Sequence, residues 1–159
     1  MNRPLWAPWR MSYIRGKKEK GCVFCTRARQ KKDRDFFILE RGKENLVILN
    51  AFPYNSGHLM VVPYQHTGQL KDLSSATFLE MMELVKRSVA VLTKTFRAEG
   101  FNVGLNQGKI AGAGITDHLH MHVVPRWAAD TNFMPLFSGS RILNEYLHET
   151  YDRLKKNWR

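Results

Sequence analysis

The sequence predicts an α+β domain built on an antiparallel sheet. Three observations favour this class: short apolar runs separated by turn residues, one long amphipathic stretch in the middle of the chain, and a segment near residue 120 in which polar and apolar residues alternate. At 159 residues, with 43% hydrophobic residues, the chain is long enough to bury one core. We therefore expect a single globular unit.

The first half of the chain predicts three strands. They lie at about 36–41, 45–51 and 58–63, where β-branched and aromatic residues are frequent. Residues 53–57, which read Pro-Tyr-Asn-Ser-Gly, are typical of a turn between the last two.

A long helix follows these strands. Thr77 and Glu80 have the spacing of a capping box, and Ser74 or Ser75 is an alternative N-cap. Gly100 is the expected stop. The apolar residues recur at three- and four-residue steps and predict a buried scaffold face: Phe78, Met81, Met82, Val85, Val89, Leu92 and Phe96.

Two more strands and a tail helix complete the expected order. The strands lie at about 101–106 and 118–124, and the helix runs from Ser138 or Ser140 to about residue 157. One side of this helix is apolar, with Ile142, Leu143, Tyr146, Leu147, Tyr151 and Leu154.

Half of the six histidines fall within five residues, at His118, His120 and His122. Because they alternate with apolar residues, a strand places all three imidazoles on one face. A row of imidazoles can bind a metal, or one imidazole can attack phosphorus while its neighbours orient it. The preceding loop, 107–114, has three glycines, Lys109 and no carboxylate, which favours an anionic substrate over a metal centred on the triad.

These motifs resemble the histidine-triad (HIT) superfamily. The resemblance is carried by Asn106-x-Gly108, the glycine-rich loop, His118-x-His120-x-His122 and the segment 50–63, and it covers roughly residues 36–127. The flanks, 5–10 and 125–133, resemble the bacterial branch related to diadenosine tetraphosphate phosphorylases. This implies a sheet of five or six strands with one long central helix and a C-terminal helix, in a homodimer.

The resemblance also assigns roles. His120 matches the nucleophile that attacks the α-phosphorus of a nucleotide and forms a nucleotidyl-histidine, with His118 and His122 completing the catalytic set. Asn50 resembles a ribose contact, and His58 either supports the triad or is a core histidine. The other expected substrate-binding residues lie at the loop: Asn106, Gln107 and Gly112. Lys109 is added from the residues and not from the resemblance, because its charge suits a phosphate oxygen.

The pair Cys22-x-x-Cys25 has several interpretations. With two cysteines and no secretion signal a structural disulfide is disfavoured, and a redox pair would need a thioredoxin-like unit. A zinc site needs two more ligands, and the resemblance supplies His66 and His118. We expect a closed, structural Cys₂His₂ zinc site.

The net charge of +11 is concentrated near the N-terminus, where residues 1–43 hold 13 Lys and Arg against 4 Asp and Glu. We expect a basic arm at 1–35 and a HIT domain at 36–159. The arm is most simply a solvated surface; attraction of polyanions, including RNA, is the alternative. No apolar run predicts a membrane helix or a signal peptide, so a cytoplasmic protein is expected.

The expected function is cleavage of a dinucleoside polyphosphate, diadenosine tetraphosphate above all, at the α-phosphorus. By the residues alone hydrolysis and phosphorolysis stay open. A nucleoside phosphoramidase is the alternative enzyme, and a non-catalytic nucleotide- or RNA-binding module is the alternative class.

Overall fold

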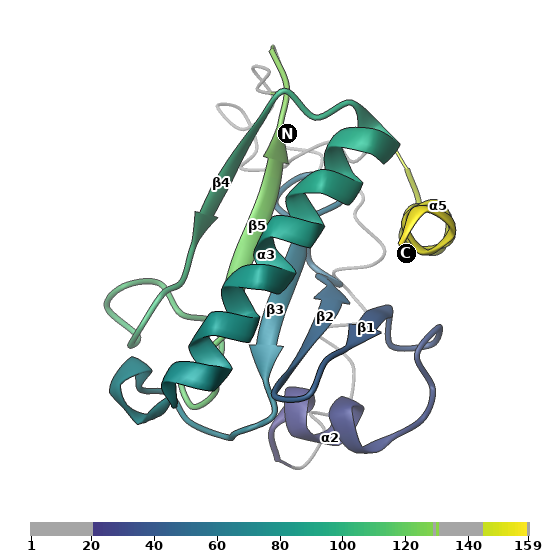
Figure 1. Ribbon diagram of the computed structural model, residues 1–159. Helices are drawn as coiled ribbons and strands as arrows, with labels where there is room; N and C mark the ends of the chain where they lie inside the picture. Colours follow the sequence, from purple (N-terminus) through teal and green to yellow (C-terminus); the bar gives the residue numbers. More distant parts are fainter. Residues whose placement is uncertain (1–20, 129, 131–144, 159) are drawn as a thin grey trace, which may run out of the picture.

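The computed structural model describes residues 21–128, 130 and 145–158 (Figure 1). Within these residues the chain forms three α-helices, five strands and one short 3₁₀ helix. In chain order they are α2 (Val23–Arg29), β1 (Ile38–Arg41), β2 (Asn45–Leu49), β3 (Leu59–Pro63), η1 (Leu70–Asp72), α3 (Ser75–Phe96), β4 (Gly100–Gly104), β5 (Met121–Arg126) and α5 (Leu147–Asn157).

The strands form one antiparallel sheet in the order β1-β2-β3-β5-β4. β5 is the last strand in the chain, yet it inserts between β3 and β4 (Figure 1). His122 is therefore opposite Met60 on one side and Gly104 on the other. The α+β class and the five-stranded antiparallel sheet predicted from the sequence are confirmed.

The long helix α3 begins after Ser74, whose hydroxyl accepts the N–H of Thr77 at 3.1 Å. Ser74 is thus the N-cap, and the capping box at Thr77 is wrong. The expected stop at Gly100 is also wrong. The helix ends at Phe96 because Arg97 takes a left-handed conformation (φ 54°, ψ 41°), and Gly100 already pairs with Arg126 as the first residue of β4.

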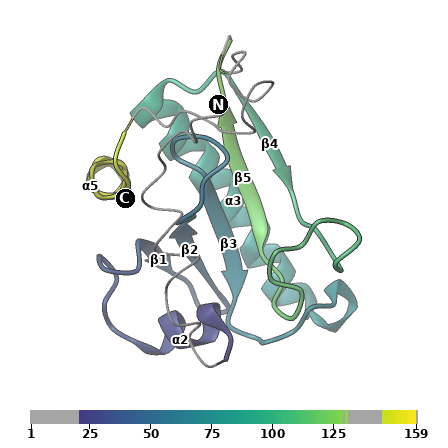
Figure 2. The same cartoon turned by 180° about the vertical axis from the view of Figure 1, so that it is seen from behind.

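Strand alternation divides the core between the two faces of the sheet. On β3, Leu59 and Val61 pack with α3 and α5, whereas Met60 and Val62 face the other way, toward α2. Figures 1 and 2 show α3 on one face and α2 on the other. His122 pairs with Met60 across the ladder, so it points to the same face as Met60 and α2. His122 is therefore on the face opposite the long helix, and the rings of His118 and His120 lie against Phe24 of α2 on that side.

The C-terminal helix α5 is fastened to β1. The Tyr151 hydroxyl donates to the Ile38 carbonyl at 3.2 Å, Lys155 Nζ donates to the Leu39 carbonyl at 2.7 Å, and Leu154 is fully buried. The predicted C-terminal helix is confirmed from Leu147 onward, and its expected start at 138–140 lies outside the described residues. Among the described residues, no helix is long and apolar enough to cross a membrane.

Candidate active site and metal cluster

The histidine triad lies at the start of β5. The strand begins at Met121, not at His118 as predicted, so only His122 is part of the ladder. The backbone just before Met121 forms its hydrogen bonds outside the sheet: the Leu119 N–H donates to the Thr67 carbonyl at 2.8 Å. His118 and His120 are nonetheless buried, at 1% and 6% exposure.

The hydrogen bonds of His120 fix its tautomer. Its Nδ1 lies 2.9 Å from the carbonyl oxygen of His118, and because a carbonyl only accepts, Nδ1 carries the proton. Nε2 then keeps its lone pair. Burial lowers the pKa of His120 below the ordinary value, so this neutral form prevails at pH 7. The arrangement supplies an unprotonated nitrogen on the middle histidine.

A second pair of imidazoles fixes His122. The Tyr54 N–H donates to His58 Nδ1 at 3.1 Å, so the proton of neutral His58 is on Nε2. That Nε2 lies 2.8 Å from His122 Nδ1 and donates to it. His122 is left with a proton on Nε2. Burial is the main cause that lowers the pKa of His58 to about 3 and that of His122 to about 4, so both are neutral at pH 7.

Asn50 is joined to this pair. Its Oδ1 accepts the Phe52 N–H at 2.9 Å, and its Nδ2 lies 3.3 Å from His58 Nδ1. The structure therefore brings Asn50, His58 and His122 together.

The glycine-rich loop leaves β4 at Gly104, directly opposite His122. Lys109 and Gly112 are exposed, and Asn106 is half-buried. Gln107 has a structural contact, because its Oε1 accepts the Leu70 N–H at 2.9 Å.

Two features of the loop concern phosphate binding. Gly108 and Gly112 have φ values of 86° and 87°, which glycine adopts without strain. The Gly112 N–H donates to the Lys109 carbonyl at 3.0 Å, so this amide is engaged in the turn. The loop thus begins beside the triad with Lys109 exposed.

The second cluster consists of Cys22, Cys25, His66 and His118, whose ligand atoms all lie within 4.8 Å of one another. His118 Nδ1 is 3.2 Å from Cys22 Sγ, 3.6 Å from Cys25 Sγ and 3.2 Å from His66 Nδ1. Cys25 Sγ is 3.4 Å from His66 Nδ1. Tetrahedral zinc with ordinary bond lengths gives ligand separations of about 3.3–3.8 Å. These four residues fit a zinc ion.

The donor chemistry agrees with that geometry. His118 Nε2 lies 2.8 Å from the Pro63 carbonyl and donates to it, which leaves Nδ1 as the lone-pair nitrogen that faces the sulfurs. Both cysteines are free thiols. The family resemblance assigned His118 both to the zinc site and to the triad. In the structure its Nδ1 lies beside Cys22 and His66, and its carbonyl accepts the Nδ1–H of His120.

Local structure brings the ligands together. Cys22 is the N-cap of α2 and Cys25 lies in its first turn. The segment that carries His66 lies very close to the approach to the triad: a Cβ on Gly68 would be 2.3 Å from the Thr116 carbonyl oxygen. Only glycine fits at this position. The helix α2 itself was not predicted from the sequence.

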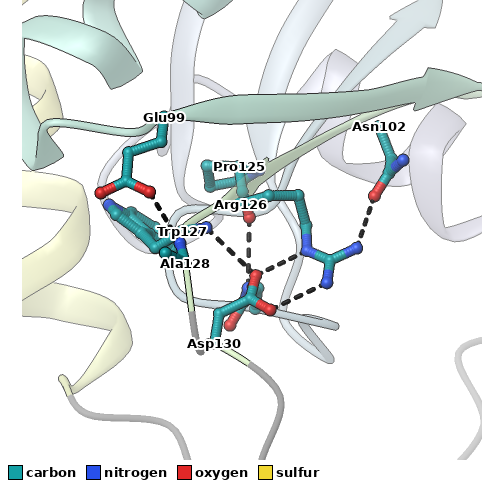
Figure 3. A network of polar contacts seen from close by, with 8 residues as sticks. Glu99, Asn102, Pro125, Arg126, Trp127, Ala128 and Asp130 are labelled. Carbon is teal, nitrogen blue, oxygen red and sulfur yellow. Dashed lines mark hydrogen bonds and ion pairs between the residues drawn. The ribbon is translucent and has the colours of Figure 1, made fainter.

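Sequence analysis also missed a network at the end of β5 (Figure 3). The carboxylate of Asp130 accepts Arg126 Nε at 2.5 Å and Nη2 at 2.8 Å, the Trp127 N–H at 3.2 Å and Asn55 Nδ2 at 2.9 Å. Asn55 Nδ2 also donates to the Pro125 carbonyl at 3.2 Å. The network ties the 53–57 turn, which precedes His58, to β5. The four-residue spacing of Arg126 and Asp130 is too common to have predicted it.

An antiparallel sheet that presents three alternating histidines beside a glycine-rich loop defines a histidine-triad class of protein. The HIT domain profile matches residues 30–129 of this chain. The chain belongs to the HIT domain family.

Named relatives in this family are enzymes. The chain is 38% identical over 162 residues to an AP-4-A phosphorylase of Mycobacterium tuberculosis (strain ATCC 25618 / H37Rv). The alignment covers 97% of this chain and 83% of the relative. It is 31% identical to an adenosine 5'-monophosphoramidase of Schizosaccharomyces pombe, over 66% of this chain and 74% of that one.

A solved structure is similar as well. It is a zinc-bound histidine triad family protein from Mycobacterium smegmatis, with a TM-score of 0.71 and 28% identity, covering 87% of this chain and 93% of that one.

Proposed function

We propose that this HIT-type enzyme cleaves a dinucleoside polyphosphate, diadenosine tetraphosphate above all, at the α-phosphorus through a nucleotidyl-His120 intermediate. The observation that carries the proposal is the bond from His120 Nδ1–H to the His118 carbonyl, which leaves Nε2 free to attack. The 38% identical AP-4-A phosphorylase supports the substrate class.

The first step forms a bond from His120 Nε2 to the α-phosphorus and breaks the bond from phosphorus to the bridging oxygen. The electron pair leaves with ATP, and AMP stays on the imidazole. His122, a neutral donor at Nε2, hydrogen-bonds a phosphate oxygen as negative charge increases there. In the second step the bond from phosphorus to His120 Nε2 breaks, and its electron pair returns to the nitrogen. Phosphate that attacks through an unprotonated oxygen gives ADP, whereas water gives AMP and releases its proton to solvent.

Five residues are proposed to hold the substrate. Asn50 contacts the ribose from the end of β2, and Lys109 pairs with a phosphate from the exposed loop. Asn106, Gln107 and Gly112 line the same loop.

We also propose a structural zinc ion on Cys22, Cys25, His66 and His118. The gathering of four ligand atoms within 4.8 Å of one another supports it, as does the zinc-bound relative. When bound, the ion would hold the start of α2 against His118, outside the reaction itself.

Intact-protein mass spectrometry tests the covalent step. Wild-type protein quenched without acid after mixing with diadenosine tetraphosphate is expected to gain the mass of one AMP, and His120→Gly is expected to gain none. His148→Gly, which removes an exposed histidine of α5, is the matched control and keeps the adduct. No adduct together with no released nucleotide would reject the enzyme in favour of a nucleotide-binding module.

The same reaction with and without phosphate identifies the acceptor. ADP plus ATP indicates phosphorolysis, and AMP plus ATP indicates hydrolysis. The relative named as a monophosphoramidase makes adenosine 5'-phosphoramidate the second substrate to test. Faster turnover of the phosphoramidate than of diadenosine tetraphosphate would make the phosphoramidase the first candidate function.

Three further expectations remain proposals. We expect a basic arm at 1–35 beside the domain at 36–159, a cytoplasmic location and a homodimer. Of the arm, residues 23–29 form α2, whose Phe24 is buried in the core. Sedimentation of the full chain at several concentrations tests the dimer.

A further inference from the structure

The helix α2 carries one buried side chain, Phe24, between the two cysteines of the metal cluster. We propose that Phe24 is a positioning residue for His120, so that occupancy of the Cys₂His₂ cluster is coupled to the placement of the nucleophile. The catalytic part rests on the function proposed above.

The ring of Phe24 contacts both buried histidines. Its centroid is 5.3 Å from that of His118, at an interplanar angle of 68°, and 5.3 Å from that of His120, at 47°. It is only 3% exposed. Phe24 packs against β1, β2 and β3 through Ile38, Leu46, Ile48, Met60 and Val62.

His120 needs such a contact because one hydrogen bond does not fix a ring. The bond from Nδ1 to the His118 carbonyl holds one atom of the imidazole and leaves the ring able to rock about it. Phe24 fills the space beside that ring, as does His122, whose centroid is 4.8 Å away at 78°. A displacement of about 1 Å in an attacking group can lower a rate about 100-fold.

The position of Phe24 in turn depends on α2. This helix has seven residues, and its N-cap, Cys22, makes no side-chain cap hydrogen bond. Helices this short are not stable by themselves. An ion that holds both cysteines to His118 would therefore fix the turn that carries Phe24.

Phe24→Leu and Phe24→Met test the positioning role. Both keep an apolar side chain in the core but remove the flat ring. We expect each variant to keep one zinc per chain and the wild-type fold by circular dichroism. We also expect kcat to fall about 10- to 100-fold with KM within about twofold. Val23→Ala is the matched control, because Val23 is on the same turn and packs against the same core cluster. It keeps the wild-type kcat.

A second measurement needs no substrate. The imidazole ¹H–¹⁵N spectrum reports the Nδ1–H of His120, assigned with His120→Gly. We expect this signal to shift in both Phe24 variants, to stay in Val23→Ala, and to move in the same direction when a chelator removes zinc from the wild type.

The outcomes separate the two proposals. An unchanged His120 signal and kcat in the Phe24 variants overturn the positioning role. A raised KM at unchanged kcat also overturns it, because Phe24 then contacts the nucleotide instead. An unchanged signal after zinc removal overturns the coupling. A wild type that shows neither turnover nor adduct refutes the proposed function, while the spectrum still decides the positioning.

Discussion

Single acceptor atoms set the chemistry of each imidazole in the site. The carbonyls of Pro63 and His118 each take one ring N–H, and His58 donates to His122. Three neighbouring histidines consequently present three different groups: a lone pair on Nδ1 in His118, a lone pair on Nε2 in His120 and a donor N–H on Nε2 in His122. The roles follow from their partners, since the side chains are identical.

His58 should matter through the proton it gives His122. In His58→Leu the His122 tautomer is no longer fixed, and we expect kcat to fall about 10- to 100-fold. His58→Gln retains an N–H that can reach His122 Nδ1, so it should recover part of the loss. Steady-state kinetics with diadenosine tetraphosphate measures both. Equal losses in the two variants would show that His58 does not act by donating a hydrogen bond to His122.

The same residue should make stability depend on pH. Burial lowers the pKa of His58 to about 3 in the folded chain, from 6.5. Between about pH 3 and pH 6.5, His58 is protonated in the unfolded chain but neutral in the folded chain. Stability due to neutral His58 is therefore complete above about pH 6.5 and declines as pH falls, by at most about 1.4 kcal/mol per pH unit.

Urea unfolding between pH 4.5 and 7.5 measures this slope. We expect a shallower slope in His58→Gln than in the wild type. His148→Gln, at an exposed position on α5, serves as the control and should keep the wild-type slope. Parallel curves for His58→Gln and wild type would contradict the prediction.

At the scale of single residues, the sequence predicted which histidines gather but not the hydrogen bonds that they form. The alternation of His118, His120 and His122, and the family resemblance that added His58 and His66, were enough to name them. Tautomers depend on backbone carbonyls such as that of Pro63, which is 55 residues away along the chain. Nothing in the sequence singled out Phe24, which lies between the two cysteines.

At the scale of elements, α3 is joined to the β1–β2 turn by Glu80. Its carboxylate accepts the N–H of Lys43 at 2.7 Å, the N–H of Glu44 at 2.8 Å and Asn45 Nδ2 at 2.8 Å. Burial alone would raise the pKa of Glu80, but these donors outweigh it and lower the pKa. The sequence had placed this residue in a capping box.

Glu80→Ala should reduce the free energy of unfolding by about 1–2 kcal/mol, because three donors lose a charged acceptor. Urea denaturation measures the change. Glu83→Ala is the control on the same helix: it removes an exposed ion pair with Lys86 and should cost under about 0.5 kcal/mol. Equal losses would show that the link to the turn contributes nothing.

Element types were predictable and boundaries were not. The apolar period of 78–96 established the long helix, but its end depends on the left-handed Arg97, which no residue preference favours. Likewise β5 begins late because Leu119 bonds Thr67 and leaves the ladder. Tertiary contacts, and not residue preferences, therefore set the ends of these elements.

For the whole molecule, the proposed zinc ion connects segments far apart in sequence. His118 is 96 residues from Cys22 and 52 from His66, so the ion would close long loops. Removing it with a chelator should lower the melting temperature by about 10 °C. Calorimetry with elemental analysis measures this. The Cys22→Ser/Cys25→Ser double variant is the control, and its melting temperature should be the same with and without chelator. A wild-type melting temperature that the chelator does not change would contradict the zinc site.

The two-faced sheet has a practical consequence for anyone who modifies this protein. Leu59 and Val61 belong to the core under α3 and α5, and their neighbours Met60 and Val62 to the side of the histidines. A library that varies only the α3–α5 core can seek heat resistance without changing residues of the proposed active site. A library directed at the opposite face can seek new substrates. Adjacent codons in one strand thus belong to separate engineering problems.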